Sequence, residues 1–181
     1  GQAAKAYSEY LPRAARISSA MASPDWDSPA TPWPSADSSS MARLFIAVWP
    51  PEDLRRRLSA ALEAAAGSAE AAAVPALRWT RPEQWHVTLR FLGSCEPDAV
   101  CRRLDALAWP AATAATGPGL STIGSSVLHI PVSGLDGLAA VVRAATADIG
   151  RPPQFRTFVG HLTVARAGRR TPLPAGLAQR W

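Results

Sequence analysis

Hydrophobic and polar positions follow two different periods along the chain. Residues 43–48, "RLFIAV", form a short apolar run typical of a buried strand, and the prolines after it end the strand. In residues 51–67 the apolar positions recur at helical spacing, with acidic residues in the first turn and Gly67 at the end. The chain therefore opens its folded part with a strand and an amphipathic helix.

The same kinds of element continue through the rest of the chain. The pattern predicts strands at residues 77–80, 85–93, 126–132 and 159–166, and helices at residues 97–107 and 137–150. An order of strand, helix and strand thus occurs twice, once in residues 41–115 and once in residues 116–181. Such repetition is typical of an internal duplication with two lobes.

Residues 1–40 have a different composition from the remainder. The stretch "MASPDWDSPATPWPSADSSS" is rich in Ser, Pro, Asp and Ala and lacks apolar periodicity. We expect residues 1–40 to be a disordered N-terminal extension, with a docking segment carrying Trp26 and Trp33 as the alternative. This extension holds three basic and four acidic residues, which leaves 16 basic and 10 acidic residues in the folded domain, residues 41–181.

Bulk composition narrows the class of protein. A chain of 181 residues that is 48% hydrophobic and 18% charged is able to bury a single core. Its net charge of +5 favours anionic partners such as phosphates or RNA. No run approaches the roughly 18 apolar residues of a membrane span, and the start lacks the apolar stretch of a secretory signal. Cys95 and Cys101 have no zinc-site spacing, so we expect free thiols in a cytoplasmic protein.

Two of the three histidines stand in the same short motif. His86 in "WHVTLRFLG" and His161 in "VGHLTVAR" are each followed by an aliphatic residue, a threonine and another aliphatic residue. Residues i and i+2 of a strand share a face and lie roughly 6.6–7 Å apart. His86 therefore shares a face with Thr88, and His161 shares a face with Thr163.

These four side chains suit one kind of chemistry if their strands meet. Because the pKa of histidine is about 6.5, one ring can be neutral and the other protonated near pH 7, as paired base and acid catalysis requires. Threonine hydroxyls can donate hydrogen bonds to phosphoryl oxygens and hold the phosphorus in line. The motifs therefore predict phosphodiester cleavage without a metal.

Two arginines next to the motifs are candidates for substrate binding. Under strict alternation Arg90 shares the face of His86 and can meet a substrate phosphate, the alternative being a solvated strand edge. Arg166 falls on the face opposite His161 unless a bulge or the strand end turns it round. The same alternation predicts that Val87, Leu89 and Phe91 face the core.

The remaining candidates are weaker. His129 has neither a threonine partner nor a twin, so we interpret it as structural or peripheral, with a place lining the cleft as the alternative. Trp79 and Trp85 flank the first motif, where they either stack on a base or pack against the core.

Four segments in this order resemble a known family. "RLFIAVWPP", "RWTRPEQWHVTLRFLG", "SVLHIPVSGL" and "FVGHLTVAR" are similar to the two-histidine (2H) phosphoesterase superfamily, in particular the bacterial RNA 2′,3′-cyclic phosphodiesterases, also called 2′-5′ RNA ligases. The resemblance covers nearly all of residues 41–170. It implies a bilobal, pseudo-two-fold α+β fold of mostly antiparallel sheets, with outer helices and a central cleft.

The resemblance also implies an activity. Members of the family open a 2′,3′-cyclic phosphate at an RNA 3′ end to a 2′-phosphomonoester, and some join tRNA halves in the reverse reaction. In this sequence His86 would donate a proton to the leaving 3′ oxygen, His161 would activate water, and Thr88 and Thr163 would bind the phosphate. The implied enzyme is a monomer that acts on RNA 3′ ends or cyclic nucleotides, with no metal, cofactor or membrane.

Three departures from the family pattern accompany these expectations. Gly160 stands where a proline commonly precedes the second histidine, which we interpret as a small change in backbone stiffness. Residues 1–40 have no counterpart, and the chain stops at Trp181, before the strands that finish the sheet in relatives. Two other functions stay open, a non-catalytic RNA or nucleotide-binding remnant and a 2H phosphodiesterase acting on a small cyclic nucleotide.

Overall fold

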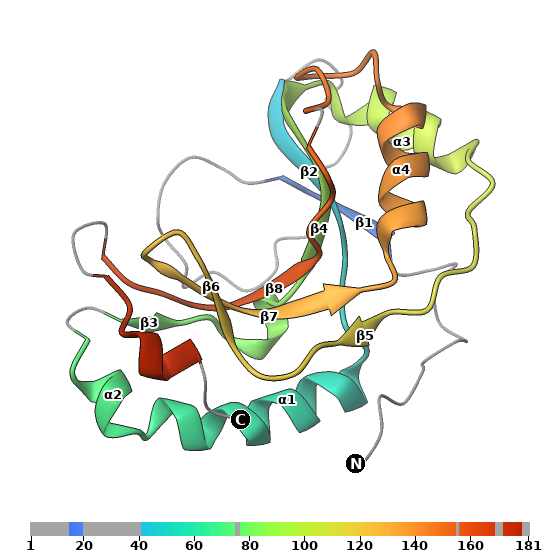
Figure 1. The fold of residues 1–181 in the computed structure, drawn as a ribbon. Helices are drawn as coiled ribbons and strands as arrows, with labels where there is room; N and C mark the ends of the chain where they lie inside the picture. The colour runs from blue at the N-terminus through green and yellow to red at the C-terminus, as the bar shows by residue number, and fades with distance from the viewer. Residues whose placement is uncertain (1–14, 20–40, 75–76, 155, 169–171, 179–181) are drawn as a thin grey trace.

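An open antiparallel sheet runs through the molecule and carries helices on its outer side (Figure 1). The structure is a computed structural model that describes residues 15–19, 41–74, 77–154, 156–168 and 172–178. Its strands are β1 (Ala15–Ser19), β2 (Ala42–Val48), β3 (Arg78–Trp79), β4 (Val87–Cys95), β5 (Ala115–Thr116), β6 (Ser121–Ile123), β7 (Val127–Ser133) and β8 (His161–Arg166). Its helices are α1 (Glu52–Ala66), α2 (Ala69–Ala72), α3 (Pro97–Asp105) and α4 (Asp136–Ala145), with 3₁₀ turns η2 (Pro82–Gln84) and η3 (Ala175–Ala178).

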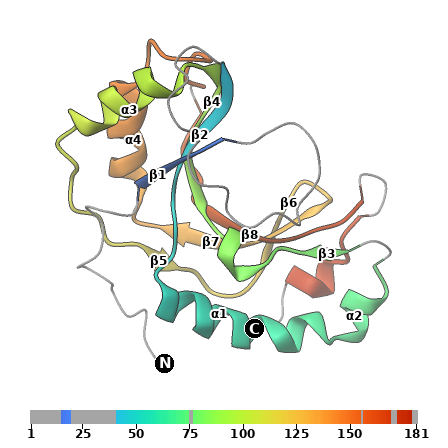
Figure 2. The same ribbon diagram turned by 180° about the vertical axis from the view of Figure 1, so that it is seen from behind.

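The strand order is β1-β2-β4-β8-β7-β5, with β3 paired to β8 and β6 paired to β7. Every pairing is antiparallel. Helices α1 and α2 run along the part of the sheet that contains β3, β5 and β7, whereas α3 and α4 stand beside β2 and β4 (Figures 1 and 2). The α+β class with outer helices is confirmed, and the internal duplication stays a prediction.

The structure differs from the sequence-based expectation in the N-terminal extension. Ala15–Ser19 forms β1 and pairs with β2 along five registered positions. The remaining residues of 1–40 lie outside the described parts of the chain. Residues 15–19 form a strand because the edge of β2 supplies their hydrogen-bond partners. The composition of residues 1–40 contains no sign of that partner.

Buried residues form one hydrophobic cluster between the sheet and the helices. Helix α1 contributes Leu58 and Leu62, and α4 contributes Leu138 and Val142. A fully buried leucine or valine contributes roughly 1.5–3 kcal/mol to folding, so these apolar stripes hold both helices on the sheet.

Two irregularities in the pairing of β2 with β4 decide which side chains reach which face. Ala47 pairs with Thr88 but Ile46 pairs with Arg90, so one residue of β4 is extra, and a second shift follows Phe45. Because neighbouring residues of β2 face opposite sides, the first of these bulges turns Arg90 away from the face of Thr88 and brings Phe91 onto it. Phe91 is 40% exposed, so its predicted place in the core is wrong.

Two further sequence expectations concern the chain as a whole. In the parts of the chain that the structure describes, no helix combines the length and apolar character needed to cross a bilayer. Cys95 and Cys101 are free thiols, as predicted, and burial raises the pKa of both.

Candidate active site

Strands β4 and β8 bring the two histidine motifs side by side. The strands pair antiparallel with Val87 opposite Leu162, and both of these side chains are buried. One residue before Val87, His86 lies across from Thr163. One residue after Val87, Thr88 lies across from His161. Side chains directly opposite each other in such a pair lie roughly 4.5–5.5 Å apart at Cβ. The predicted convergence of the four residues on one sheet face therefore follows from the observed pairing.

The two histidine rings are held by matching hydrogen bonds. His86 Nδ1 lies 2.7 Å from the backbone oxygen of Gln84, and His161 Nδ1 lies 2.9 Å from that of Val159. Since a carbonyl oxygen only accepts, each Nδ1 carries the hydrogen and donates it. Each Nε2 is thereby left with a lone pair when the ring is neutral and with a proton when it is charged. Both rings are thus prepared for proton transfer through the same atom.

The local sequence explains how the first of these bonds is made. Pro82 begins the 3₁₀ turn η2, and the backbone N–H of Gln84 donates to the oxygen of Arg81. The turn ends at Gln84, and its last carbonyl accepts the hydrogen bond from the ring of His86 two residues further on, just before β4 begins at Val87. The indole Nε1 of buried Trp85 donates to the oxygen of Thr80 at 2.9 Å and anchors the turn.

Aromatic rings from β2 and its C-terminal end pack against His86. The Phe45 ring lies 5.0 Å from the imidazole and the Trp49 ring lies 5.6 Å from it, both measured between ring centroids. Trp79 and Trp85 instead pack with the hydrophobic core, which agrees with the second of their two predicted roles.

The electrostatic surroundings of His86 favour its neutral form in the free protein. Burial is the largest cause of its lowered pKa; the bond to Gln84 opposes the shift, and the positive charges of Arg166 and His161 add to it. A bound anion would act in the opposite direction, because negative charge beside an imidazole stabilises the protonated ring. Binding of an anion at this position and protonation of His86 are therefore coupled.

A bulge between β7 and β8 decides the position of Arg166. His129 pairs with Thr163 but Leu128 pairs with Ala165, so one residue of β8 is extra. Arg166 then pairs with Val127, two residues from His129 and on the same side of β7. The exception foreseen in the sequence thus holds, and Arg166 lies on the face of the histidines with an exposed side chain.

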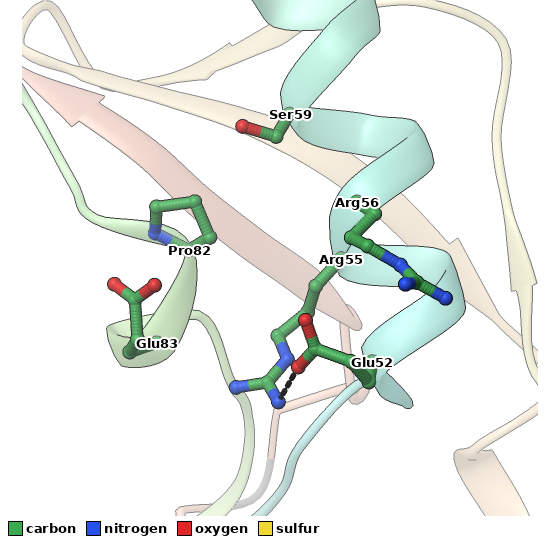
Figure 3. Close-up of a pocket in the computed structure, with 6 residues that line it drawn as sticks. All are labelled: Glu52, Arg55, Arg56, Ser59, Pro82 and Glu83. Carbon is green, nitrogen blue, oxygen red and sulfur yellow. Dashed lines mark hydrogen bonds and ion pairs between the residues drawn. The ribbon is translucent and has the colours of Figure 1, made fainter.

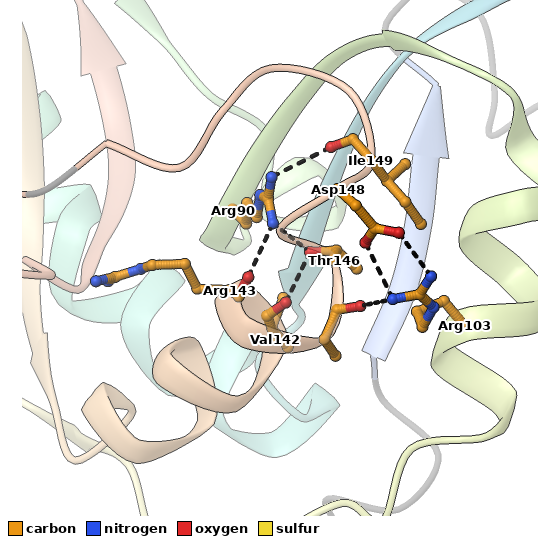
Figure 4. A network of polar contacts seen from close by, with 8 residues as sticks. Arg90, Arg103, Val142, Arg143, Thr146, Asp148 and Ile149 are labelled. Carbon is orange, nitrogen blue, oxygen red and sulfur yellow. Dashed lines mark hydrogen bonds and ion pairs between the residues drawn. The ribbon is translucent and has the colours of Figure 1, made fainter.

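Arg90 is buried on the other face, at 6% exposure (Figure 4). One guanidinium nitrogen donates to the oxygen of Arg143 at 3.0 Å and to Thr146 Oγ1 at 2.6 Å. The other donates to the oxygens of Ile149 at 3.2 Å and Arg151 at 2.9 Å. The expectation that Arg90 shares the face of His86 is wrong, because the β4 bulge interrupts the alternation on which it rested.

His129 lies beside the histidine motifs, in agreement with the alternative that the sequence left open for it. It lies on β7 across from Thr163, and its ring is 5.6 Å from that of His161 at an interplanar angle of 76°. It is only 5% exposed, and burial, with a smaller contribution from the charge of His161, lowers its pKa. Only the register of β7 against β8 places it here, since no motif surrounds it.

Other features of the described surface lie apart from the histidines. A shallow pocket between α1 and η2 is lined by Glu52, Arg55, Arg56, Ser59, Pro82 and Glu83, with Glu52 accepting a hydrogen bond from Arg55 (Figure 3). Among the described residues no three His, Cys, Asp or Glu side chains are grouped as a metal site would require.

Comparison with known proteins agrees with this architecture. A phosphoesterase of known crystal structure superimposes with a TM-score of 0.56 and 24% identity, over 74% of this chain and 80% of the other. This likeness shows a shared α+β fold. No curated protein matches the chain significantly.

The sequence match is narrower and names a family. Residues 48–118, which include His86 and Thr88, match the family model described as LigT like phosphoesterase. The segment that carries the first histidine motif is therefore similar to the LigT-like phosphoesterases.

Proposed function

We propose that this protein hydrolyses 2′,3′-cyclic phosphodiester ends of RNA to 2′-phosphomonoesters, using two histidines as acid and base and no metal. The observation that carries the proposal is the matched pair of imidazoles, His86 and His161, each anchored through Nδ1 and each with a threonine opposite it on the same sheet face. Two such rings supply both proton transfers that a phosphodiester cleavage needs.

In the proposed reaction, two proton transfers accompany the exchange of bonds at phosphorus. His161 Nε2 removes a proton from water, and the water oxygen forms a bond to phosphorus. The bond between phosphorus and the 3′ oxygen breaks, and His86 Nε2 gives its proton to that oxygen. The 2′ ester survives, so the product is the 2′-phosphomonoester. When the 5′ hydroxyl of a second RNA takes the place of water, its oxygen forms the bond to phosphorus as the bond to the 3′ oxygen breaks. The same two proton transfers then give a 2′-5′ phosphodiester, which is the 2′-5′ ligation of related enzymes.

The other groups on this face stabilise the charge that develops on phosphorus. Hydroxyls of Thr88 and Thr163 donate to the non-bridging oxygens, and the guanidinium of Arg166 offsets their negative charge. The phosphate in turn raises the pKa of His86 from its lowered value in the free protein and so loads the proton that the leaving group takes.

The test is hydrolysis of a short RNA with a 2′,3′-cyclic end in the presence of EDTA. We expect the 2′-phosphate as sole product and a loss of about 10²–10⁴ in kcat for His161→Ala, because the base is removed. Binding of the substrate, measured separately with the variant, should persist. Full turnover by His161→Ala would refute the proposal, and binding without any product in the wild type would identify a nucleotide-binding remnant instead.

A second measurement separates the two histidines. A phosphodiester with a nitrophenolate leaving group needs no proton from an acid, so His86→Ala should lose much less activity on it than on the RNA end, whereas His161→Ala should lose activity on both. Equal losses for both variants on both substrates would contradict the assigned roles.

The setting of this reaction is part of the same proposal. Two free thiols fit a reducing compartment, so we place the enzyme in the cytoplasm as a monomer that acts on RNA ends.

A further inference from the structure

The face that carries His86 continues along β2 and β4 beyond the two motifs. On this face Trp49 lies across from His86, and the registered pairs that follow are Ala47 with Thr88, Phe45 with Phe91 and Arg43 with Ser94. Strand residues on one face repeat at roughly 6.6–7 Å, so Phe45 and Phe91 lie one such step beyond Thr88. The bulge between Thr88 and Arg90 is the reason that Phe91 belongs to this row.

The row is continuous with the candidate active site. The Phe45 ring contacts the imidazole of His86, at 5.0 Å between centroids. Beyond it, the guanidinium carbon of Arg43 lies 5.7 Å from the centre of the Phe91 ring. Phe91 is 40% exposed and Arg43 is exposed, so both present their surfaces to an incoming ligand.

This combination of groups matches single-stranded nucleic acid. Aromatic rings stack on any base, an arginine meets the backbone phosphate and also stacks, and both are sequence-tolerant. A mononucleotide offers a single base, whereas an RNA end carries further bases and phosphates 5′ of the reacting group, which the row beyond the histidines can contact. The folded part of the chain also carries the excess of basic residues that an anionic polymer requires.

We propose that Arg43, Phe45 and Phe91 form a track for the nucleotides 5′ of the reacting phosphate, which makes the enzyme selective for single-stranded RNA ends over mononucleotides. The inference rests on the proposed function and extends it to the substrate class. Phe45 stacks on the base nearest the phosphate, Phe91 stacks on the next base, and Arg43 binds the phosphate between or beyond them.

The experiment compares kcat/KM for a 2′,3′-cyclic mononucleotide and for a trinucleotide with the same end. Loss of one stacked base corresponds to roughly a 5- to 150-fold change, so Phe91→Ala should lower the ratio of trinucleotide to mononucleotide activity by that factor. Phe91→Leu, which keeps the apolar bulk and removes the ring, should lower it as well. Arg43→Ala should lower the ratio and weaken its dependence on salt.

Ile123→Ala is the matched control. Ile123 has the same exposed fraction as Phe91, 40%, and lies on β6. The Ile123→Ala variant should leave the ratio of trinucleotide to mononucleotide activity unchanged. A ratio that Phe91→Ala does not lower, or lowers no more than Ile123→Ala does, overturns the track.

A binding measurement keeps this outcome separate from failure of the proposed function. Fluorescence anisotropy with a labelled, uncleavable trinucleotide reports the track even if the wild type hydrolyses none of the cyclic substrates. Weaker binding by Phe91→Ala than by Ile123→Ala then supports the track without the reaction. Equal binding by the two variants refutes it.

Discussion

At the scale of single residues, Gly160 shows how a residue without a side chain positions the candidate catalytic residue that follows it. A Cβ at this position would lie 2.3 Å from the backbone oxygen of Val132 and 3.2 Å from the ring of Phe158. The glycine oxygen also accepts a hydrogen bond from the N–H of Val132 at 2.9 Å. The residue before His161 is therefore set by close approach of two backbones, which corrects the interpretation based on stiffness alone.

We expect Gly160→Ala to damage both stability and catalysis. The added methyl group forces β8 away from β7, at a cost of about 1–3 kcal/mol for overpacking. The shift moves the His161 ring, and a misplacement of about 1 Å costs on the order of 10²-fold in rate. Thermal unfolding and kcat on the cyclic RNA end measure the two effects.

The control for this substitution is Gly137→Ala in α4. A Cβ there meets nothing within 4 Å, and alanine in a helix is more favourable than glycine by roughly 0.5–1 kcal/mol. This variant should be slightly stabilised and fully active. A Gly160→Ala protein that behaves in the same way would show that the close approach has no consequence.

At the scale of elements, Arg90 joins strand β4 to helix α4 and to the loop that follows it. Its guanidinium binds three backbone oxygens and the hydroxyl of Thr146. Thr146 itself donates to the oxygen of Val142 at 2.7 Å (Figure 4). Burial lowers the pKa of this arginine, yet its usual value is so high that it stays charged. The network fixes β4, and with it the first histidine motif, against the helix layer.

We predict that Arg90→Met lowers the free energy of unfolding by about 3 kcal/mol, because buried acceptors lose their donors. Urea unfolding measures the change. Arg103, whose exposed guanidinium binds Asp148 and the oxygen of Ala145, supplies the comparison, and Arg103→Ala should cost much less. Similar losses in the two variants would contradict a central role for the buried network.

The elements also show which strands a sequence pattern can reveal. Strands β2, β4, β7 and β8 have apolar runs long enough to be recognised, and they were predicted at nearly their observed positions. Strands β5 and β6 have two and three residues, too few to establish a period of two. Their stability comes from pairing with β7, a partner that local sequence does not specify.

At the scale of the whole molecule, folding is linked to pH through buried histidines. The pKa values of His86 and His129 are both lowered in the folded protein, with burial as the largest cause. Below the unfolded pKa of about 6.5 the unfolded chain therefore binds more protons than the folded one. Stability is fully present above that pH and falls as pH decreases toward the folded-state values.

The measurement is the free energy of unfolding in urea at pH 8, 6.5 and 5.5. We expect a decrease from pH 6.5 to 5.5 that becomes shallower in His129→Phe, because one titrating group is removed. Stability that rises over this interval would contradict the neutral, buried state of these rings.

The sequence by itself determined the main strands and helices and the two His-x-Thr motifs, because periodicity and local residue chemistry are written within short segments. Tertiary structure decided which faces those residues occupy. The bulges in β4 and β8 moved Arg90 into the interior and brought Phe91 and Arg166 to the histidine face, and the register of β7 added His129. Bulges and registers arise from pairing between distant strands, so no local pattern contains them.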